Sequence, residues 1–299
     1  MKRIDLSIII VSFNTRELTS ECIQSIIDNV KKINFEIIVV DNDSKDDSVA
    51  YLKQYFPQVL LISSTQNLGF SKANNLGVKA AKGRYVLFLN SDTVVYPGAI
   101  EHMVEFMDLT KDAGAATCFL KMPNGKLDDA AHRGFPTPWR ALCQFSGLGR
   151  IFTKSMTFNG YHLGFCNLDK VHRIEALAGA FMLVRREAGE EVGWWDEDYF
   201  FYGEDIDFCY MLIQKGWKIY FDPRVTVLHY KGASGGIKKI SAKVTTADME
   251  TRRRVTIARF NAMKIFYRKH YRKKYNSLVY YLILKAIDFK KSFALRSLT

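Results

Sequence analysis

The first ninety residues alternate between short apolar runs and segments with helical periodicity. The apolar runs span residues 6–12, 36–40, 59–62 and 85–89. Between them, apolar residues recur every three to four positions, which predicts helices. Strands that alternate with helices pair in parallel through right-handed crossovers. The pattern therefore predicts an α/β fold with a doubly wound, mostly parallel sheet.

Polar residues predict how two of these helices begin. Asn14 and Glu17 have the spacing of a capping box for the helix after the first strand. Ser71 is a typical cap for the helix that ends near Gly83.

Carboxylates directly follow two of the predicted strands. Asp41 and Asp43 come after the second strand, and Asp92 comes after the fourth, in the turn Asn90-Ser91-Asp92. Because parallel strands end at the same sheet edge, these acids could flank one nucleotide crevice, one for a base or ribose and one for a diphosphate-bound metal. Asp92 could equally start a turn or cap the next helix.

The residues after the first strand exclude some classes of nucleotide-binding enzyme. They read VSFNTRE, without the GxGxxG of dinucleotide-binding folds, and no P-loop pattern is present. This argues against a dehydrogenase and against a P-loop NTPase. Nucleotidylyl transfer would require a Gly/Arg/Lys-rich segment at the same place, which the sequence lacks.

The middle of the chain is harder to interpret. Residues 128–172 contain several glycines and prolines and have no persistent periodicity. Such insertions are where acceptor specificity is expected. His132, Arg133, Trp139 and Arg140 could contact an acceptor there, although ordinary surface or packing roles are the simpler interpretation.

A cluster of acids follows an aromatic run near residue 200. Glu204, Asp205 and Asp207 lie within four residues, directly after residues 199–202. Like charges this close repel one another unless a cation or a function compensates. The alternative is an ordinary first helical turn, where the helix dipole favours acids.

Composition indicates a globular protein. The chain has 299 residues, of which 48% are hydrophobic, and no run reaches the length needed to span a bilayer. The N-terminus turns polar too early for a signal peptide, which predicts a cytoplasmic location. Five cysteines without a CxxC pair argue against disulfides or a zinc site and predict reduced thiols.

The positive charge is concentrated in the C-terminal segment. Residues 251–299 hold fourteen Lys and Arg and one acid, a balance of +13 within a net charge of +12. Residues from Val255 to Tyr271 have the pattern of a basic amphipathic helix, and residues 278–284 form a short apolar segment. This tail could bind an anionic membrane, pack on the rest of the protein, or bind nucleic acid.

Five motifs in order resemble glycosyltransferase family 2 enzymes with the GT-A fold, and among them the rhamnosyltransferase-type members. The resemblance covers roughly residues 4–235 and rests on these segments: SIIIVSFN at 7–14, IIVVDNDSKD at 37–46, NLGFSKANNLG at 67–77, VLFLNSDT at 86–93 and DEDYFFYGEDIDFCY at 196–210.

The resemblance implies a domain plan and a reaction. Residues 1–95 would form the nucleotide-binding half and 96–235 the acceptor and catalytic half of one GT-A domain, followed at 236–299 by a flexible loop and the basic tail. The reaction would be an inverting, metal-dependent transfer of a sugar, rhamnose from dTDP-rhamnose, to a saccharide or lipid-linked saccharide in cell-surface polysaccharide synthesis. UDP-galactofuranose, UDP-glucose and UDP-N-acetylhexosamine are alternative donors. We expect peripheral association with the cytoplasmic face of the membrane and no nucleic-acid partner.

The resemblance also implies roles for individual residues. Asp205 would be the catalytic base, and Asp92 and His229 would bind Mg²⁺ or Mn²⁺, although only one of the two acids of a DxD motif is present in NSD. Residues 232–243 would form a lid over the donor. Contacts to the donor sugar or acceptor would come from Gly179, Trp195, Glu204 and Lys231, the last near the phosphates. The donor nucleotide would contact Ser12, Asn14, Asp41, Asn67, Gly69, Asn74, Asn90 and Ser91.

Overall fold

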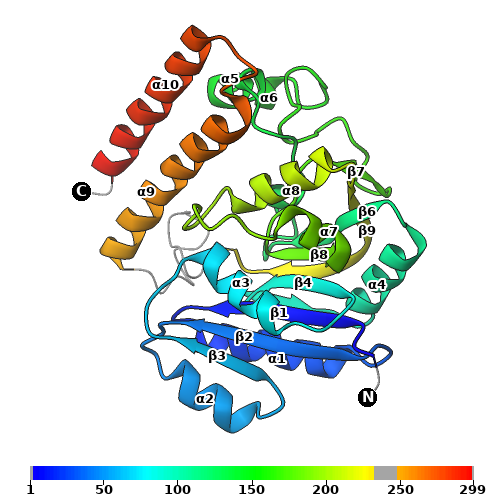
Figure 1. Ribbon diagram of the computed structural model, residues 1–299. Helices are drawn as coiled ribbons and strands as arrows, with labels where there is room; N and C mark the ends of the chain where they lie inside the picture. The colour runs from blue at the N-terminus through cyan, green and yellow to red at the C-terminus, as the bar shows by residue number, and fades with distance from the viewer. Residues whose placement is uncertain (1–2, 232–247, 298–299) are drawn as a thin grey trace.

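The computed structural model describes residues 3–231 and 248–297 (Figure 1). The predicted lid at 232–243 lies outside the described residues. The first half of the chain alternates strands and helices as predicted. Its elements are β1 (Leu6–Ser12), α1 (Arg16–Asn29), β2 (Phe35–Asn42), α2 (Ser48–Tyr55), β3 (Leu60–Ser64), α3 (Phe70–Ala80) and β4 (Tyr85–Asn90).

The second half contains both the shortest and the longest strands of the sheet and most of the irregular segments. Its elements are β5 (Thr93–Val95), α4 (Ala99–Leu109), β6 (Ala113–Lys121), η1 (Asp129–Ala131), α5 (Pro138–Ser146), α6 (Leu148–Ile151), β7 (His172–Ile174), β8 (Phe181–Arg185), α7 (Arg186–Val192), α8 (Glu204–Gln214) and β9 (Lys218–His229). The C-terminal segment forms α9 (Met249–Phe266), the π-helical turn η3 (Tyr267–Tyr271) and α10 (Ser277–Arg296).

One sheet joins both halves. Its order is β3-β2-β1-β4-β8-β6-β9-β5, with β7 paired to β9. The first four strands are parallel, whereas β8 runs antiparallel to both β4 and β6. The α/β prediction is therefore confirmed, and the parallel pairing predicted from the first ninety residues holds for that half, while the second half is mixed.

The central strand β4 is covered on both faces because its side chains alternate between two cores. Tyr85, Leu87 and Leu89 pack with α1 and α4 on one face, and Val86 and Phe88 pack with α7 and α8 on the other. These burial requirements explain the uninterrupted apolar run. They also fix the position of Asn90 and the residues after it at the sheet edge.

The two predicted helix caps are wrong because tertiary contacts use the polar groups differently. The Asn14 Oδ1 accepts a hydrogen bond from the Lys45 amide at 2.7 Å, and α1 begins after Thr15 without a side-chain cap. Ser71 lies inside α3, which begins after Gly69. Both helix starts are held by neighbouring loops instead of local caps.

The C-terminal segment packs on the body of the protein through its first helix. Val255, Ala262 and Phe266 of α9 are buried, as are Tyr267 and Tyr271 of η3. Phe266 and Tyr271 meet the ring of Tyr210 on α8 at centroid distances of 5.7 and 6.3 Å. The packing interpretation of the tail thus holds for α9 and η3. In α10, by contrast, Ile287 is the one buried residue of the described helix.

Among the helices in residues 3–231 and 248–297, none is both long enough and apolar enough to cross a membrane.

Candidate active site

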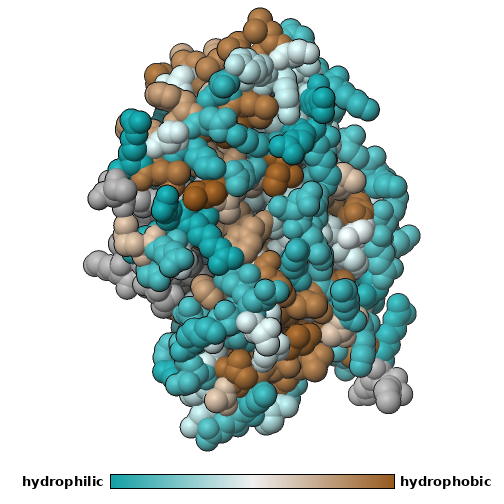
Figure 2. Space-filling view, turned by 60° about the vertical axis from the view of Figure 1, so that its left-hand side comes forward, coloured by the Kyte–Doolittle hydropathy of each residue, from teal (hydrophilic) through white to brown (hydrophobic). Residues whose placement is uncertain are grey.

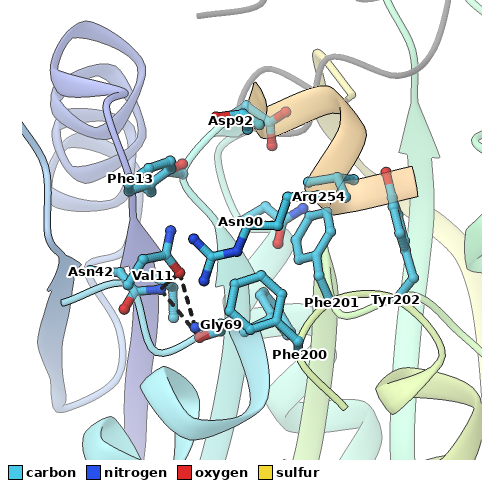
Figure 3. Close-up of a pocket in the computed structure, with 15 residues that line it drawn as sticks. Val11, Phe13, Asn42, Gly69, Asn90, Asp92, Phe200, Phe201, Tyr202 and Arg254 are labelled. Atoms are coloured by element: carbon cyan, nitrogen blue, oxygen red, sulfur yellow. Dashed lines mark hydrogen bonds between the residues drawn. The ribbon is translucent and has the colours of Figure 1, made fainter. Parts of the chain in front are cut away.

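A pocket opens at the carboxyl ends of β1, β2 and β4 (Figure 3). It is closed on the opposite side by the aromatic residues 200–202 and by the first turns of α9. Of the residues predicted to bind the donor or its metal, Asn67, Gly69, Asn90, Ser91 and Asp92 line this pocket. The sheet edge predicted from the strand pattern is therefore where these residues meet.

Asn42 holds one wall of the pocket in shape. Its Oδ1 accepts a hydrogen bond from the Leu68 amide at 2.8 Å, and its Nδ2 donates to Asn67 Oδ1 and to the Gly69 carbonyl, each at 3.2 Å. The sequence interpretation singled out the neighbouring acid and missed this amide. Asn42 directly follows Asp41 at the end of β2, and this position could have indicated that it lies at the pocket.

Gly69 allows the aromatic loop at residues 200–202 to approach closely; from the sequence, it was expected to contact the donor nucleotide. Its φ is +80°, and a Cβ there would lie 2.4 Å from the carbonyl oxygen of Phe200. That same carbonyl accepts a hydrogen bond from the Phe70 amide at 2.7 Å. Glycine is thus required so that the aromatic loop can lie against the start of α3.

Asp41 has one unused carboxylate oxygen. Its Oδ1 accepts a hydrogen bond from the Ser44 amide at 3.0 Å, while its buried Oδ2 has no hydrogen-bond partner among the described residues. A buried acceptor without a donor is costly. An N–H group of a bound base would satisfy it.

Asp41 and three other predicted donor contacts lie outside the pocket lining. The hydroxyl of Ser12 is buried 2.9 Å from that of Thr19. Asn14 joins the loops after β1 and β2. Asn74 is buried in α3, where its Nδ2 donates to the Phe70 carbonyl at 2.9 Å. These three polar side chains form hydrogen bonds within the protein and support the residues that line the pocket.

Asp92 and His229 meet as the sequence predicted. The Asp92 Oδ1 lies 3.2 Å from His229 Nε2, and the Asn90 Nδ2 lies 3.4 Å from the same nitrogen. Antiparallel pairing of β5 with β9, which places Thr93 opposite His229, produces this contact. The two side chains are nearly fully buried.

Asp128 is a further member of this group that the sequence did not reveal. Its Oδ2 lies 2.9 Å from His229 Nδ1, so the carboxylate orients the ring. Burial alone would lower the pKa of His229, but the charges of Asp92 and Asp128 outweigh it and raise that pKa to about 9. The ring is therefore protonated near neutral pH and bridges the two carboxylates. A divalent cation would take the place of the proton on Nε2 and be held by His229 and Asp92, while Asp128 orients the ring, and in that sense these residues fit a divalent cation.

Lys231 does not reach the pocket, contrary to the expectation that it lies near the donor phosphates. Its ammonium pairs with Asp128 and, at 2.7 Å, with Asp129. With its side chain nearly buried, it balances the charge of the carboxylate that orients His229.

Asp205 lies at the start of α8 in a buried ion pair. The Arg133 Nη2 donates to its Oδ2 at 2.6 Å, and the side chains are 11% and 14% exposed, respectively. Sequence analysis favoured an ordinary packing role for Arg133. Its actual partner lies 72 positions further along the chain, in a segment whose periodicity gave no indication of the contact.

Tyr202 connects this acid to the pocket. It lines the pocket, and burial raises the pKa of its phenol to about 12, with Glu204, Asp92 and Asp205 adding to the shift. Glu204 is buried with its Oε2 unpartnered among the described residues, and burial followed by the charge of Asp205 raises its pKa well above the usual value. Tyr202 on the pocket and the buried Glu204 therefore both feel the charge of Asp205.

Gly179 and Trp195 are core residues, which corrects their predicted contact with the sugar or acceptor. The Trp195 ring is 2% exposed and stacks on Phe208 at 5.0 Å. A Cβ on Gly179 would lie 3.0 Å from the ring of Phe70. Glycine therefore lets β8 enter beside this aromatic cluster.

A second cluster of metal-ligating residues lies apart from the pocket lining. Ligand atoms of His132, Cys166 and His172 lie within 4.8 Å of one another. His172 Nδ1 donates to the Lys170 carbonyl at 2.7 Å, which leaves its Nε2 to accept from His132 Nε2 at 2.6 Å. Burial lowers the pKa of His132 to about 4, so a neutral His132 that donates its one ring proton to His172 accounts for the contact.

Comparisons with known proteins agree with the fold. The family model described as Glycosyl transferase family 2 matches residues 7–169. The N-acetylglucosaminyl-diphospho-decaprenol L-rhamnosyltransferase of Mycobacterium tuberculosis is 30% identical over 212 residues, which cover 67% of this chain and 68% of that protein. The rhamnosyltransferase WbbL of Escherichia coli is 28% identical over 231 residues, covering 75% of this chain and 82% of that one.

Solved structures share the architecture. The mannosyltransferase PcManGT from Pyrobaculum calidifontis, in complex with GDP-Man and Mn²⁺, matches with a TM-score of 0.58 and 16% identity, over 100% of this chain and 74% of that one. At this identity the match concerns the fold, which is GT-A. Together with the family match and the relatives, it establishes that the chain belongs to glycosyl transferase family 2 and is a glycosyltransferase.

Proposed function

We propose that the protein transfers rhamnose from dTDP-rhamnose, with inversion, to a hydroxyl of a saccharide or lipid-linked saccharide in cell-surface polysaccharide synthesis. The observation that carries the proposal is the meeting of Asp92 and His229 beside the pocket at the sheet edge. The unpartnered Asp41 oxygen supports a pyrimidine base, whose N3–H is a suitable donor. The two relatives named as rhamnosyltransferases support the choice of sugar.

The chemistry assigned to the chain is a single displacement at the anomeric carbon. The acceptor oxygen forms a bond to that carbon while the bond to the diphosphate oxygen breaks, and Asp205 accepts the hydroxyl proton. Arg133 holds the Asp205 carboxylate in orientation. Asp92 and His229 would hold Mg²⁺ or Mn²⁺, which supplies neutralisation of charge on the departing diphosphate.

A panel of nucleotide sugars with and without Mn²⁺ tests the donor and the metal. We expect the midpoint of thermal unfolding to rise most with dTDP-rhamnose and Mn²⁺, since a ligand at 100 times its Kd stabilises by about 2.7 kcal/mol. A larger shift with a UDP-sugar would assign the alternative donors, galactofuranose, glucose or N-acetylhexosamine. No shift with any nucleotide sugar would contradict the proposed function.

Variants of the proposed metal pair make this test specific. We expect Asp92→Ala and His229→Ala each to weaken Mn²⁺-dependent donor binding by at least about 10-fold, the lower range for disturbed metal sites. Leu109→Ala, on the exposed surface of α4, should bind as the wild type does. If His229→Ala retains the full metal dependence, the histidine is structural.

For the acceptor side, we propose that α10 holds the protein on an anionic membrane at the cytoplasmic face. Leu278, Leu282, Phe289 and Phe293 lie on one side of this helix, at spacings of four, seven and four residues. Phe289 is 75% exposed and Phe293 is 72% exposed. An apolar stripe of this kind, flanked by lysines, is typical of interfacial helices.

The neighbouring helices α5 and α6 extend this apolar surface. Trp139, Leu142, Phe145 and Ile151 are exposed, and the Lys290 ammonium of α10 lies 3.2 Å from the ring centroid of Phe145. Figure 1 places α5, α6 and α10 at the upper end of the molecule. At this end, Figure 2 shows hydrophobic residues interspersed with hydrophilic ones. A membrane contact here would bring a lipid-linked acceptor to the insertion at 128–172.

Binding to vesicles tests this surface. We expect Leu282→Glu/Phe289→Glu to lose co-sedimentation with anionic vesicles, while Leu109→Glu, a control that is 77% exposed on α4, retains it. Truncation before α9 is unsuitable because it would also remove α9 and η3 and so uncover Tyr210 on α8, against which Phe266 and Tyr271 pack. Equal binding by the double variant would contradict the proposal, and binding of generic DNA with a steep salt dependence would favour the nucleic-acid alternative.

A further inference from the structure

The start of α9 forms part of the pocket at the sheet edge. Thr251, Arg254 and Val255 line it, although they follow the catalytic region matched by the sequence motifs. Arg254 projects from α9 between Asn42 and Phe200 in Figure 3. Its guanidinium carbon lies 4.3 Å from the centroid of the Phe200 ring.

The Arg254 charge is uncompensated in the described part of the chain. Residues 3–231 and 248–297 supply no carboxylate within ion-pairing distance, whereas Lys264 pairs with Asp288, and Lys269 pairs with Asp207 at 2.8 Å. Among the described residues that line the pocket, Arg254 is also the one cationic side chain. The other charged side chain of the lining is Asp92, which the proposed function assigns to the metal. An arginine without an ion pair at such a pocket is a binding group for an anionic ligand.

The helix that carries Arg254 is fixed firmly over the pocket. Val255 and Ala262 are buried, and a Cβ on Gly203 would lie 3.1 Å from the Ala262 side chain, so glycine permits α9 to approach the start of α8 closely. Asp207 on α8 then accepts hydrogen bonds from Lys269 at 2.8 Å and His270 at 2.6 Å. Because the helix is held at both places, the position of Arg254 is set before a ligand arrives.

We propose that Arg254 binds the diphosphate of the donor, so that the C-terminal segment is a functional wall of the donor site. This assignment rests on the proposed function, which supplies a nucleoside diphosphate as leaving group. Stacking on Phe200 holds the guanidinium plane, while its N–H groups remain available for bidentate contact with phosphate oxygens. Arg254 takes the role that the sequence interpretation gave to Lys231.

Calorimetric binding of UDP and dTDP, each compared with its nucleoside in the presence of Mg²⁺, tests the assignment. We expect Arg254→Gln to lose about 10-fold or more in affinity for the diphosphate that the wild type binds, and to leave nucleoside affinity unchanged. Arg254→Lys should recover part of the loss, since it restores charge without the planar fork. Arg253→Gln, the same change at an exposed neighbouring residue outside the pocket lining, should bind as the wild type does.

Two results would overturn the inference while leaving the proposed function intact. One is unchanged diphosphate affinity in Arg254→Gln. The other is an equal loss of affinity for the nucleoside, which would mean that Arg254 contacts the base. Absence of nucleotide binding by the wild type would instead remove the proposed function, and this inference with it. The unfolding midpoint of Arg254→Gln should match that of Arg253→Gln, because both side chains are exposed.

Discussion

Replacing Asp205 by Asn is expected to reduce sugar transfer by about 10²- to 10⁴-fold, the usual contribution of a general base. The asparagine amide cannot take up the proton of the acceptor hydroxyl at neutral pH. It has nearly the same size as the carboxylate, so the packing around it should not change. Donor affinity should remain near the wild-type value, because Asp205 is absent from the lining of the pocket. Transfer and donor binding measured on the same preparation separate these effects.

The control for this variant is Asp198→Asn, at an exposed acid just before the aromatic residues 199–202. It changes the charge by the same amount and should keep full activity. Turnover above a tenth of the wild-type rate in Asp205→Asn would exclude Asp205 as the base. Glu204, a buried acid with a raised pKa, would then be the next residue to test.

Removing the Asp207 carboxylate is expected to destabilise the protein by about 3–5 kcal/mol, the cost of breaking a buried ion pair by deleting one partner. Asp207 is 2% exposed and accepts hydrogen bonds from Tyr199 at 3.1 Å, Lys269 at 2.8 Å and His270 at 2.6 Å. In Asp207→Ala these three donors lose a common acceptor, and the contact between α8 and the C-terminal segment weakens. Urea unfolding measures the change.

Asp288→Ala provides the comparison for Asp207→Ala. It deletes the pair between Lys264 on α9 and a half-exposed acid on α10, which should contribute little to stability because solvent screens the two charges. Similar losses in the two variants would show that the Asp207 contacts do not determine how the segment is held. A larger loss in Asp207→Ala would identify them as its main attachment.

The features predicted correctly from sequence are those with local or directional signals. Alternating strands and helices gave the parallel half of the sheet, and the direction of parallel strands gave the shared edge. The pairing of Asp92 with His229 was implied by the family motifs, and strands β5 and β9 bring them together. The apolar run at β4 predicted burial on both faces.

The errors concern side chains whose partners lie far away in sequence. Arg133 pairs with Asp205, and Asp128 contacts both His229 and Lys231. These partners are separated by up to 103 positions in the sequence. Residue type alone does not distinguish a lysine near phosphate from one that neutralises a buried acid. Trp195 was likewise assigned to a ligand although its ring fills the core beside Phe208.

The pocket at the sheet edge draws its walls from segments far apart in the described chain, from Val11 on β1 to Val255 on α9. All strands of the sheet precede α9, so the sheet can form as soon as β9 has left the ribosome. The pocket acquires its last wall only after α9 has also been synthesised and has packed on α8. A nascent chain that has folded its sheet would therefore still lack one wall of the pocket, and we expect the proposed donor binding to wait until synthesis has passed α9.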